Sequence, residues 1–340
     1  MGEPTYIVTG AAGHLGSCVV KELLAQGREV RAFVLPGEAC PDFIETNRHL
    51  LKEYTGNVCN PDTLAGIFED EAPDGLIVIH CAGLISITKK EDRRVYDVNV
   101  GGTENIVRMC RKYQVKRLVY ISSVHAIPPL PRGQTMREIR SFSPDTVHGY
   151  YDKTKAIATQ LVLDATKDGL DAVVVHPSGI IGPHGLPNGN MAQLITLYVR
   201  RKLPAAIHGG FDFVDVRDVA HGVIEAAVAG KSGECYILSN RYVDLKEMFD
   251  ILSVAAAIKK LKLYVPLWVA KAVTPFTEVY YRLARKTPLF TLYSLQTVSE
   301  NSMYSHEKAS KELNYFTRSL RETLTDTAQW IKRKKSPTRS

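Results

Sequence analysis

Near its start the chain reads Tyr6-Ile-Val-Thr-Gly10-Ala-Ala-Gly13-His-Leu-Gly16, an apolar strand followed by three glycines spaced three residues apart. Gly10 permits a tight turn out of the strand, and Gly13 has no side chain to keep the backbone away from a pyrophosphate. Gly16 lets the following helix pack closely on the sheet, and the N-terminus of that helix offers N–H groups and partial positive charge to phosphates. A strand (4–9), a glycine turn and a helix (15–26) in this order predict a dinucleotide-binding unit rather than an ordinary glycine-rich turn.

The composition is that of a globular protein with a large core. The chain has 340 residues, of which 45% are hydrophobic and 23% are charged. No apolar run reaches the roughly 18 residues that cross a bilayer. The net charge of +7 is uneven, because five basic residues lie in the last nine positions: Lys332, Arg333, Lys334, Lys335 and Arg339. We therefore expect no nucleic-acid-binding face, and at most a weak contact of the basic tail with an anionic membrane surface.

The cysteines predict the compartment. The six thiols, at positions 18, 40, 59, 81, 110 and 235, are scattered and form no close pair. This spacing predicts buried, reduced thiols with neither a disulfide framework nor a metal site. A strand begins within the first residues, which leaves no basic-then-apolar leader segment. We expect a cytoplasmic protein.

The first half of the chain alternates apolar strands with helical stretches. This alternation predicts an α/β fold of Rossmann type with a doubly wound parallel sheet. Several strands are continuous Val/Ile runs, as in strands buried on both faces. The expected strands span 6–9, 29–35, 52–55, 76–81, 117–122 and 172–176. The expected helices span about 15–26, 61–70, 92–112 and 149–167.

The pattern loosens after Pro177, where six Gly and Pro residues between 179 and 189 predict a loop. The later elements predict a smaller C-terminal α/β substrate lobe: helices near 190–201, 217–229, 244–257, 266–285 and 319–333, and a strand near 234–238. We divide the chain into an NAD(P)-binding Rossmann domain (1–176), a substrate-binding lobe that shares its core (177–335) and a basic tail (336–340). The boundary is approximate, because the chain interleaves.

Tyr151 and Lys155 lie four residues apart on a predicted helix, so they project from one face. A free tyrosine has a pKa near 10 and is a poor acid or base at neutral pH. A neighbouring ammonium stabilises the phenolate and lowers that pKa. The pair is therefore a candidate acid–base centre, although a surface tyrosine beside a solvated lysine gives the same pattern.

Two hydroxyls, Ser122 and Ser123, follow the strand 117–122. They stand at the carboxyl end, where α/β sheets bind ligands. A serine there can hydrogen-bond a substrate oxygen and hold it against the tyrosine, or it can cap the next turn. His125 and His176 are candidate substrate contacts on the same reasoning, though a lone histidine near a strand end is more often structural.

Together these residues resemble the extended short-chain dehydrogenase/reductase family, that is, the NAD-dependent epimerase/dehydratase superfamily. The resemblance covers nearly the whole chain. Its motifs are Thr9-Gly10-x-x-Gly13-x-x-Gly16, Gly56-Asn57-Val58, His80-Cys81-Ala82-Gly83, Asn99-Val-Gly-Gly-Thr103-x-Asn105, Tyr151-x-x-x-Lys155, His176-Pro177-Ser178-Gly-Ile-Ile-Gly182-Pro183 and Phe213-Val-Asp215-Val-Arg-Asp218. Asn57 departs from the aspartate usual beside the adenine, but an amide can still contact an adenine edge.

The resemblance implies roles for particular residues. Tyr151 would be the acid/base, Lys155 would lower its pKa and bind the nicotinamide ribose, and Ser123 would orient the substrate oxygen. Asn99 would be a structural or proton-relay residue. The implied cofactor contacts are Gly10, Ala12, Gly13, His14, Leu15, Gly16, Asn57, Val58, Cys81, Ala82, Gly83, Lys155, Pro177 and Ser178. The implied substrate contacts are Ser122, His125 and Ile180, and no metal is implied. The choice of Ser123 over Ser122 rests on family register.

Within this family, the stretch 176–183 and the last third of the chain look most like reductases of dihydroflavonol-reductase or 3β-hydroxysteroid dehydrogenase type. We therefore expect an oxidoreductase that interconverts a secondary alcohol and a ketone on a bulky apolar substrate by hydride transfer. The aromatic and aliphatic helix 263–285 belongs to the core or roofs an apolar pocket. Two alternatives stay open. One is a nucleotide-sugar epimerase or dehydratase with tightly bound NAD, and the other is a non-catalytic cofactor-binding sensor.

The cofactor is NAD or NADP. The second strand ends Phe33-Val34-Leu35-Pro36, which has neither the acid that favours NAD nor the arginine that favours NADP. We therefore expect weak discrimination between them. The expected partner is a small-molecule substrate, and the family resemblance implies a homodimer.

Overall fold

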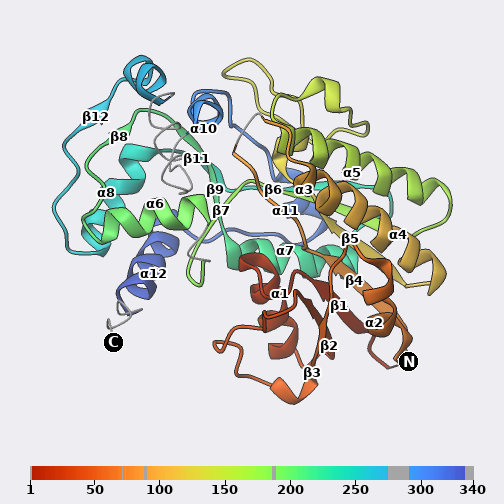
Figure 1. Cartoon of the computed structure of the whole chain (residues 1–340). Helices are drawn as coiled ribbons and strands as arrows, with labels where there is room; N and C mark the ends of the chain where they lie inside the picture. The colour runs from red at the N-terminus through yellow and green to blue at the C-terminus, as the bar shows by residue number, and fades with distance from the viewer. Residues whose placement is uncertain are drawn as a thin grey trace.

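A seven-stranded parallel sheet forms the centre of the protein (Figure 1). The computed structural model describes residues 2–70, 72, 74–87, 90–185, 189–274 and 291–333. The strands run in the order β10-β6-β5-β4-β1-β2-β3, so the sequence order reverses between β1 and β4. Their bounds are β1 (Thr5–Thr9), β2 (Val30–Val34), β3 (Leu51–Thr55), β4 (Leu76–His80), β5 (Arg117–Ile121), β6 (Ala172–Pro177) and β10 (Cys235–Leu238). This reversal is the switch point at which open α/β sheets bind ligands, and it confirms the predicted fold class.

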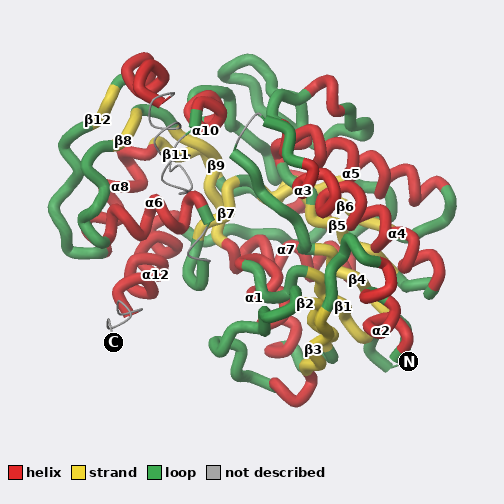
Figure 2. Tube along the Cα trace, in the orientation of Figure 1, coloured by secondary structure: helices red, strands yellow, loops and turns green. Residues whose placement is uncertain are grey.

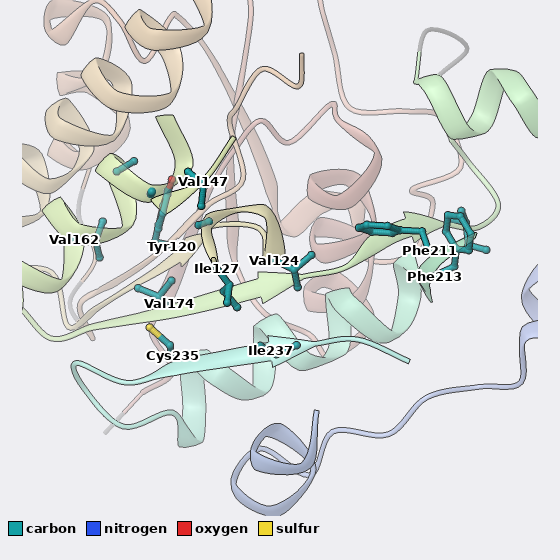
Figure 3. Packing of buried hydrophobic residues seen from close by; sticks show 14 of the residues in the cluster. Tyr120, Val124, Ile127, Val147, Val162, Val174, Phe211, Phe213, Cys235 and Ile237 are labelled. Carbon is teal, nitrogen blue, oxygen red and sulfur yellow. The ribbon is translucent and has the colours of Figure 1, made fainter. Parts of the chain in front are cut away.

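Helices cover both faces of this sheet. Figure 1 shows α1 (His14–Ala25) and α7 (Val216–Ala229) on one side and α4 (Thr103–Lys112) and α5 (Tyr150–Lys167) on the other. Strand β5 is apolar because both of its faces are buried. Leu118 and Tyr120 enter the core beneath α4 and α5, whereas Val119 and Ile121 enter the core beneath α1 and α7. Figure 3 shows part of the first of these cores, with Tyr120 and Val174 among its side chains.

The remaining elements form a lobe beside the carboxyl edge of the sheet (Figure 2). A three-stranded sheet, in the order β11-β9-β7, leads into it, and a two-stranded sheet pairs β12 with β8. The bounds are β7 (Gly179–Ile181), β8 (Ala206–Ile207), β9 (Gly210–Asp215), β11 (Arg241–Asp244) and β12 (Tyr264–Val265). The lobe helices are α6 (Asn190–Val199), α8 (Leu245–Ala255), α10 (Leu292–Thr297) and α12 (Leu320–Arg333), whereas α11 (Glu307–Glu312) packs beside β10 of the main sheet. Between them, α7 and β10 return to the layers of the main sheet.

Two predicted helices of the first half differ in form. The expected helix 92–112 is α3 (Arg93–Tyr96), a wider π-helical turn (Asp97–Gly102) and α4. Within that turn a side chain on Gly102 would collide with Val58, so the backbone approaches closely there. The expected helix 61–70 is a 3₁₀ turn (Pro61–Thr63) and the short α2 (Ala65–Glu69). π turns inside helices occur often at functional sites, and this one carries Asn99.

The lobe departs most from the sequence-based expectation. Of the five short strands there, only the end of β9 was expected, from the motif Phe213-Val-Asp215-Val-Arg-Asp218. The other four have two to four residues and carry too little periodicity to identify. The helix expected at 266–285 is helical over 267–274, and the rest lies outside the described residues, as does the basic tail 336–340. Trp268 is 74% exposed and Val273 is 50% exposed. The expectation that these two side chains belong to the core or roof a pocket is therefore wrong.

Candidate active site

The glycine turn after β1 is built for close backbone approach. Gly10 has φ +64°, and a Cβ there would lie 2.8 Å from the backbone nitrogen of Ala82, at the end of the neighbouring strand β4. A Cβ on Gly16 would collide with the carbonyl oxygen of Gly10. Helix α1 begins at His14 with Gly13 as its N-cap, and no side chain caps it. Its first N–H groups are therefore free for a ligand, which fits a pyrophosphate between β1 and β4.

Ala12 lies in this same turn, and Leu15 is the second residue of α1. His14 ties the turn to the lobe. The His14 imidazole donates from Nε2 to the carbonyl oxygen of Pro183, at 2.9 Å. Beyond it, the rings of Phe43 and His184 stack with centroids 3.9 Å apart. These contacts join the glycine turn, the chain after β2 and the loop after β7. Phe43 and His184 were not singled out in the sequence, because no spacing relates them.

The residues predicted to lie beside the adenine of the cofactor form hydrogen bonds that stabilise their own turn. Asn57 accepts from the backbone N–H of Cys59 through Oδ1, at 2.9 Å. Val58 is buried, and its carbonyl oxygen accepts from Nδ2 of Asn105 at 2.8 Å. These bonds fix the segment 56–58 at the end of β3, on the carboxyl edge of the sheet. In this structure the Asn57 side chain serves the local turn.

The tyrosine and one serine meet at the end of β5. Asp152 accepts from the backbone N–H of Gly149 at 2.8 Å and closes the first turn of α5, which positions Tyr151. The Ser123 side chain lies near enough to the Tyr151 phenol to lower its pKa, and its Oγ also accepts from the backbone N–H of His125 at 3.2 Å. By contrast, the Ser122 hydroxyl lies 2.6 Å from Oγ1 of Thr159, inside the core. The structure therefore brings Ser123, and not Ser122, to the tyrosine.

A buried histidine sets the direction of Ser123. His176 on β6 donates from Nδ1 to the Ser123 carbonyl oxygen, at 2.9 Å. Burial lowers the pKa of His176 to about 4, so this ring stays neutral. Its place behind the Ser123 backbone makes it a positioning residue, which is the structural role that the sequence favoured for a lone histidine near a strand end. His125 instead presents its imidazole beside Tyr151, with ring centroids 6.1 Å apart.

Lys155 lies one turn along α5, inside the protein. Its Nζ donates to the carbonyl oxygen of Ile121 at 2.8 Å and lies 3.5 Å from the hydroxyl of Tyr120. Burial lowers the pKa of Lys155 to about 8. Burial also raises the pKa of Tyr151 above its ordinary value. The expected lowering of the tyrosine pKa by the lysine is therefore not seen, because desolvation dominates and the ammonium turns toward β5.

Asn99 joins the cofactor-side wall to α5. Its Oδ1 accepts from the backbone N–H of Leu84 at 2.8 Å, and its Nδ2 donates to the Leu84 carbonyl oxygen at 3.0 Å and to Thr154 Oγ1 at 3.1 Å. This holds the segment of Cys81, Ala82 and Gly83 against the helix that carries the tyrosine. A Cβ on Gly83 would lie 3.5 Å from Nζ of Lys155, so the glycine leaves room beside the lysine.

The segment after β6 closes the site on the lobe side. Pro177 ends β6, Ile180 lies in β7, and the Ser178 hydroxyl donates to Oδ1 of Asp212 at 2.6 Å. Asp212 is fully buried, and its Oδ2 has no hydrogen-bond partner among the described residues. Burial raises the pKa of Asp212 to about 6. The polar group behind Ser178 is therefore a poorly solvated carboxyl.

Asp212 gives the protein a testable pH dependence. Its folded-state pKa lies above the unfolded value, so the folded state holds a proton that the unfolded chain has released between these values. This stabilisation is complete below the unfolded pKa and is lost as the pH rises through about 6. Asp212→Asn keeps the acceptor oxygen and removes the titration. Between pH 4.5 and 7, we expect urea unfolding to show a loss of free energy about 2 kcal/mol larger in the wild type than in Asp212→Asn. Equal losses in the two proteins would contradict the assignment.

Comparison with known proteins identifies the family. Residues 6–239 match the NAD dependent epimerase/dehydratase family. The chain belongs to this family. It is 30% identical to a putative dihydroflavonol 4-reductase of Synechocystis over 96% of this chain and 94% of that protein. It is 26% identical to 3 beta-hydroxysteroid dehydrogenase type 7 of Mus musculus over 96% and 95% of the two chains. The crystal structure of gox2253 superposes with a TM-score of 0.81 at 28% identity, over 97% of this chain and 98% of that one.

The family settles the class of protein. This chain is an extended short-chain dehydrogenase/reductase enzyme that acts between CH–OH and C=O groups, with NAD or NADP as its cofactor. The glycine turn, the uncapped helix α1 and the space beside Gly83 fit that cofactor. Across the described ranges, no helix is long and apolar enough to cross a membrane. Within those same ranges, no three His, Cys, Asp or Glu side chains gather to hold a metal ion.

Proposed function

We propose that the protein interconverts a secondary alcohol and a ketone on a bulky, largely apolar substrate of hydroxysteroid or dihydroflavonol type. The observation that carries this proposal is the approach of Ser123 to Tyr151 at the carboxyl end of β5, on the sheet edge that also bears the glycine turn. The names of the relatives in Synechocystis and Mus musculus support the same branch.

The site residues have different roles in the proposed reaction. A bound nicotinamide supplies or accepts the hydride. Tyr151 and Ser123 hydrogen-bond the substrate oxygen, and Tyr151 gives or takes its proton. Because burial raises the pKa of Tyr151, the phenol holds its proton at neutral pH and is ready to act as the acid in ketone reduction. Lys155, with its pKa of about 8, holds its ammonium on the Ile121 carbonyl oxygen, and we assign it to the nicotinamide ribose of the bound cofactor. Asn99 holds the cofactor-side wall in place.

A substrate panel read at the nicotinamide absorbance tests this proposal. We expect turnover with hydroxysteroids or with aryl and alicyclic ketones, and none with UDP-sugars. Turnover of UDP-sugars by tightly bound NAD, without added cofactor, would instead establish the epimerase alternative. Cofactor binding with no turnover of any panel member would establish the sensor alternative.

Weak discrimination between NAD and NADP is a further expected result. Leu35, which follows β2, is 47% exposed and has no charge to offer a ribose or its phosphate. Arg31 lies in the middle of β2 and donates to the carbonyl oxygens of Ile67 and Asp70, at 2.9 and 3.0 Å, so it is held away from the strand end. We expect the ratio of kcat/KM values for the two cofactors to stay below about a hundred. Leu35→Arg should shift this ratio toward NADP by about fivefold. A hundredfold preference of the wild type for either cofactor would show that another residue recognises the ribose or its phosphate.

We further propose a cytoplasmic homodimer. The homodimer is what the family resemblance implies, and an open groove between α4 and α5, lined by Val107, Leu161, Arg108 and Asp164, offers apolar and oppositely charged groups to a second copy. All six cysteines are free thiols, which supports a reducing compartment. Light scattering should give twice the mass of one chain for the wild type, and the mass of a single chain for Leu161→Arg.

A further inference from the structure

The outer end of the lobe carries three exposed apolar side chains. Leu263, which directly precedes β12, is 58% exposed. Trp268 and Val273 lie in the helical segment 267–274 that follows β12, and they are 74% and 50% exposed. Figure 1 shows the chain from α8 through β12 to this segment on the side of the lobe away from the main sheet. These side chains form an apolar surface that the described part of the chain does not cover.

The backbone beneath this surface is fixed. Leu267 and Ala270 of the helical segment pack against the core, and the hydroxyl of Thr274 donates to the carbonyl oxygen of Ala270 at 2.7 Å. The carbonyl oxygen of Leu263 accepts from the backbone N–H of Ala206 at 3.1 Å. The exposed side chains are therefore presented by an anchored element, and a partner pays no further ordering of the backbone to meet them.

The same end of the lobe is strongly basic. Residues 251–277 contain four lysines and no acidic residue, and residues 189–211 contain two arginines, one lysine and no acidic residue. The pairing of β12 with β8 brings the two segments together, with Tyr264 opposite Ala206. We define the basic–apolar face as Leu263, Trp268 and Val273 together with seven exposed basic residues: Arg200, Arg201, Lys202, Lys259, Lys260, Lys262 and Lys271.

Little of this charge is neutralised within the protein. Lys260 lies 3.3 Å from Asp250, whose carboxylate also accepts from Lys246 at 3.0 Å. Within the described ranges, Lys259, Lys262 and Lys271 form no ion pair. A second copy of the chain would set like charges against one another in a symmetric contact, which disfavours a homodimer through this face. The face instead suits an anionic partner that also accepts apolar side chains.

An anionic lipid bilayer has both properties. Its headgroups attract lysine and arginine, and the boundary with its acyl chains accepts apolar side chains. Tryptophan is favoured at that depth because its ring is apolar and its N–H is polar. A nucleic acid would use the same positive charge but would leave Leu263 and Val273 without apolar partners, since its recognition relies on stacking against aromatic rings and on hydrogen bonds.

We infer that the basic–apolar face docks the protein reversibly on an anionic membrane surface, with Trp268 at headgroup level and the basic residues around it. The contact is peripheral, because single side chains on a folded lobe reach only the boundary between headgroups and acyl chains. The sequence suggested at most a weak contact through the basic tail 336–340, and the face adds the large apolar side chains that this tail lacks. Docking goes beyond the proposed reaction and is measured without a substrate.

Co-sedimentation of the full chain with lipid vesicles tests this docking. One set of vesicles is phosphatidylcholine alone, and the other contains about 30% phosphatidylserine. At about 0.1 M KCl we expect a partition coefficient at least about tenfold higher on the anionic vesicles, and at about 0.5 M KCl a fall toward the neutral value, because salt screens surface charges. Equal binding to both sets, or no binding to either, would overturn the inference.

Trp268→Ser tests the apolar part of the face. It should lower the partition coefficient on anionic vesicles by at least about fivefold, with the melting temperature unchanged because the side chain is exposed. Phe316→Ser is the matched control. Phe316 is 58% exposed and lies beside His221 of α7, so it is on another part of the surface and its loss should leave the partition coefficient as in the wild type. Equal losses in the two variants would contradict a specific face.

The double variant Lys259→Gln with Lys262→Gln tests the basic part, and it too should lose at least about fivefold. Lys231→Gln with Lys311→Gln removes the same charge from exposed positions beside the main sheet, where each lysine pairs with a glutamate. This control should keep most of the binding. If both pairs lost binding equally, net charge rather than the basic–apolar face would be responsible.

The emission of Trp268 locates the contact directly. The chain has two tryptophans, so Trp330→Phe leaves Trp268 as the only one. Anionic vesicles should shift its emission to shorter wavelength, and bromine-labelled lipids should quench it. Co-sedimentation without either change would place the contact on another surface and overturn the inference. So would a fall in the mass of the wild-type particle on Trp268→Ser, which indicates a contact between copies, or tighter binding to a single-stranded oligonucleotide than to anionic vesicles.

Discussion

Tyr151→Phe should lower kcat by 10²–10⁴-fold and leave the affinity for NAD(P)H within about twofold. The ring stays, so the packing beside His125 is kept, and only the proton carrier beside Ser123 is lost. The cofactor cleft lies along the glycine turn and Lys155, which the substitution does not touch. Steady-state kinetics with the best panel substrate, and fluorescence titration with NAD(P)H, measure the two quantities.

Tyr150→Phe is the matched control for this change. Tyr150 is the first residue of α5 and only partly buried, and it has no contact with Ser123 among the described residues. Its kcat should stay within about twofold of the wild type. If Tyr151→Phe retained more than about a tenth of wild-type kcat, the acid–base assignment would be wrong. Lys155→Met should lower both kcat and cofactor affinity, because its ammonium faces the space beside Gly83.

Local patterns predicted the sheet and the glycine turn well. The strand, glycine turn and helix of 6–26 form a unit whose geometry depends on neighbouring residues only, and the continuous apolar strands identify a buried parallel sheet. The place of β10 beside β6 was not predicted. That pairing joins residues far apart in the chain, and nothing within the strand 235–238 says which edge it takes.

The alternation of side chains along strand β5 distinguishes the two serines that follow it. Leu118 and Tyr120 face α5, and Ser122 continues that alternation, so its hydroxyl reaches Thr159 on the same helix. Ser123 is left for the site. The pattern was present in the sequence and would have separated the two serines without reference to a family. The roles of Tyr120 and Asp152 could not be predicted in this way, because each depends on contacts made through the tertiary fold.

Much of the segment expected to belong to the core or roof the substrate pocket lies outside the described residues. Apolar residues at helical spacing in 263–285 suggested a roof, but hydrophobic composition alone does not say which way a helix faces. In the described part of this segment Trp268 is exposed to solvent, whereas Leu267 and Ala270 pack against the core.

Gly16→Ala should weaken NAD(P)H binding by at least tenfold and lower the free energy of unfolding by about 1–3 kcal/mol. A methyl group on Gly16 meets the backbone of Gly10 and, at 3.1 Å, the Cα of Ala11, so the turn itself must move. That displacement removes the N–H groups of α1 from the phosphates. Gly66→Ala is the matched control, because Gly66 lies in the helix α2 with open space where its Cβ would stand. It should bind cofactor normally and be as stable as the wild type, or more stable by about 0.4–1 kcal/mol. Equal effects of the two substitutions on cofactor affinity would refute the role given to the glycine turn, since only one of them touches it.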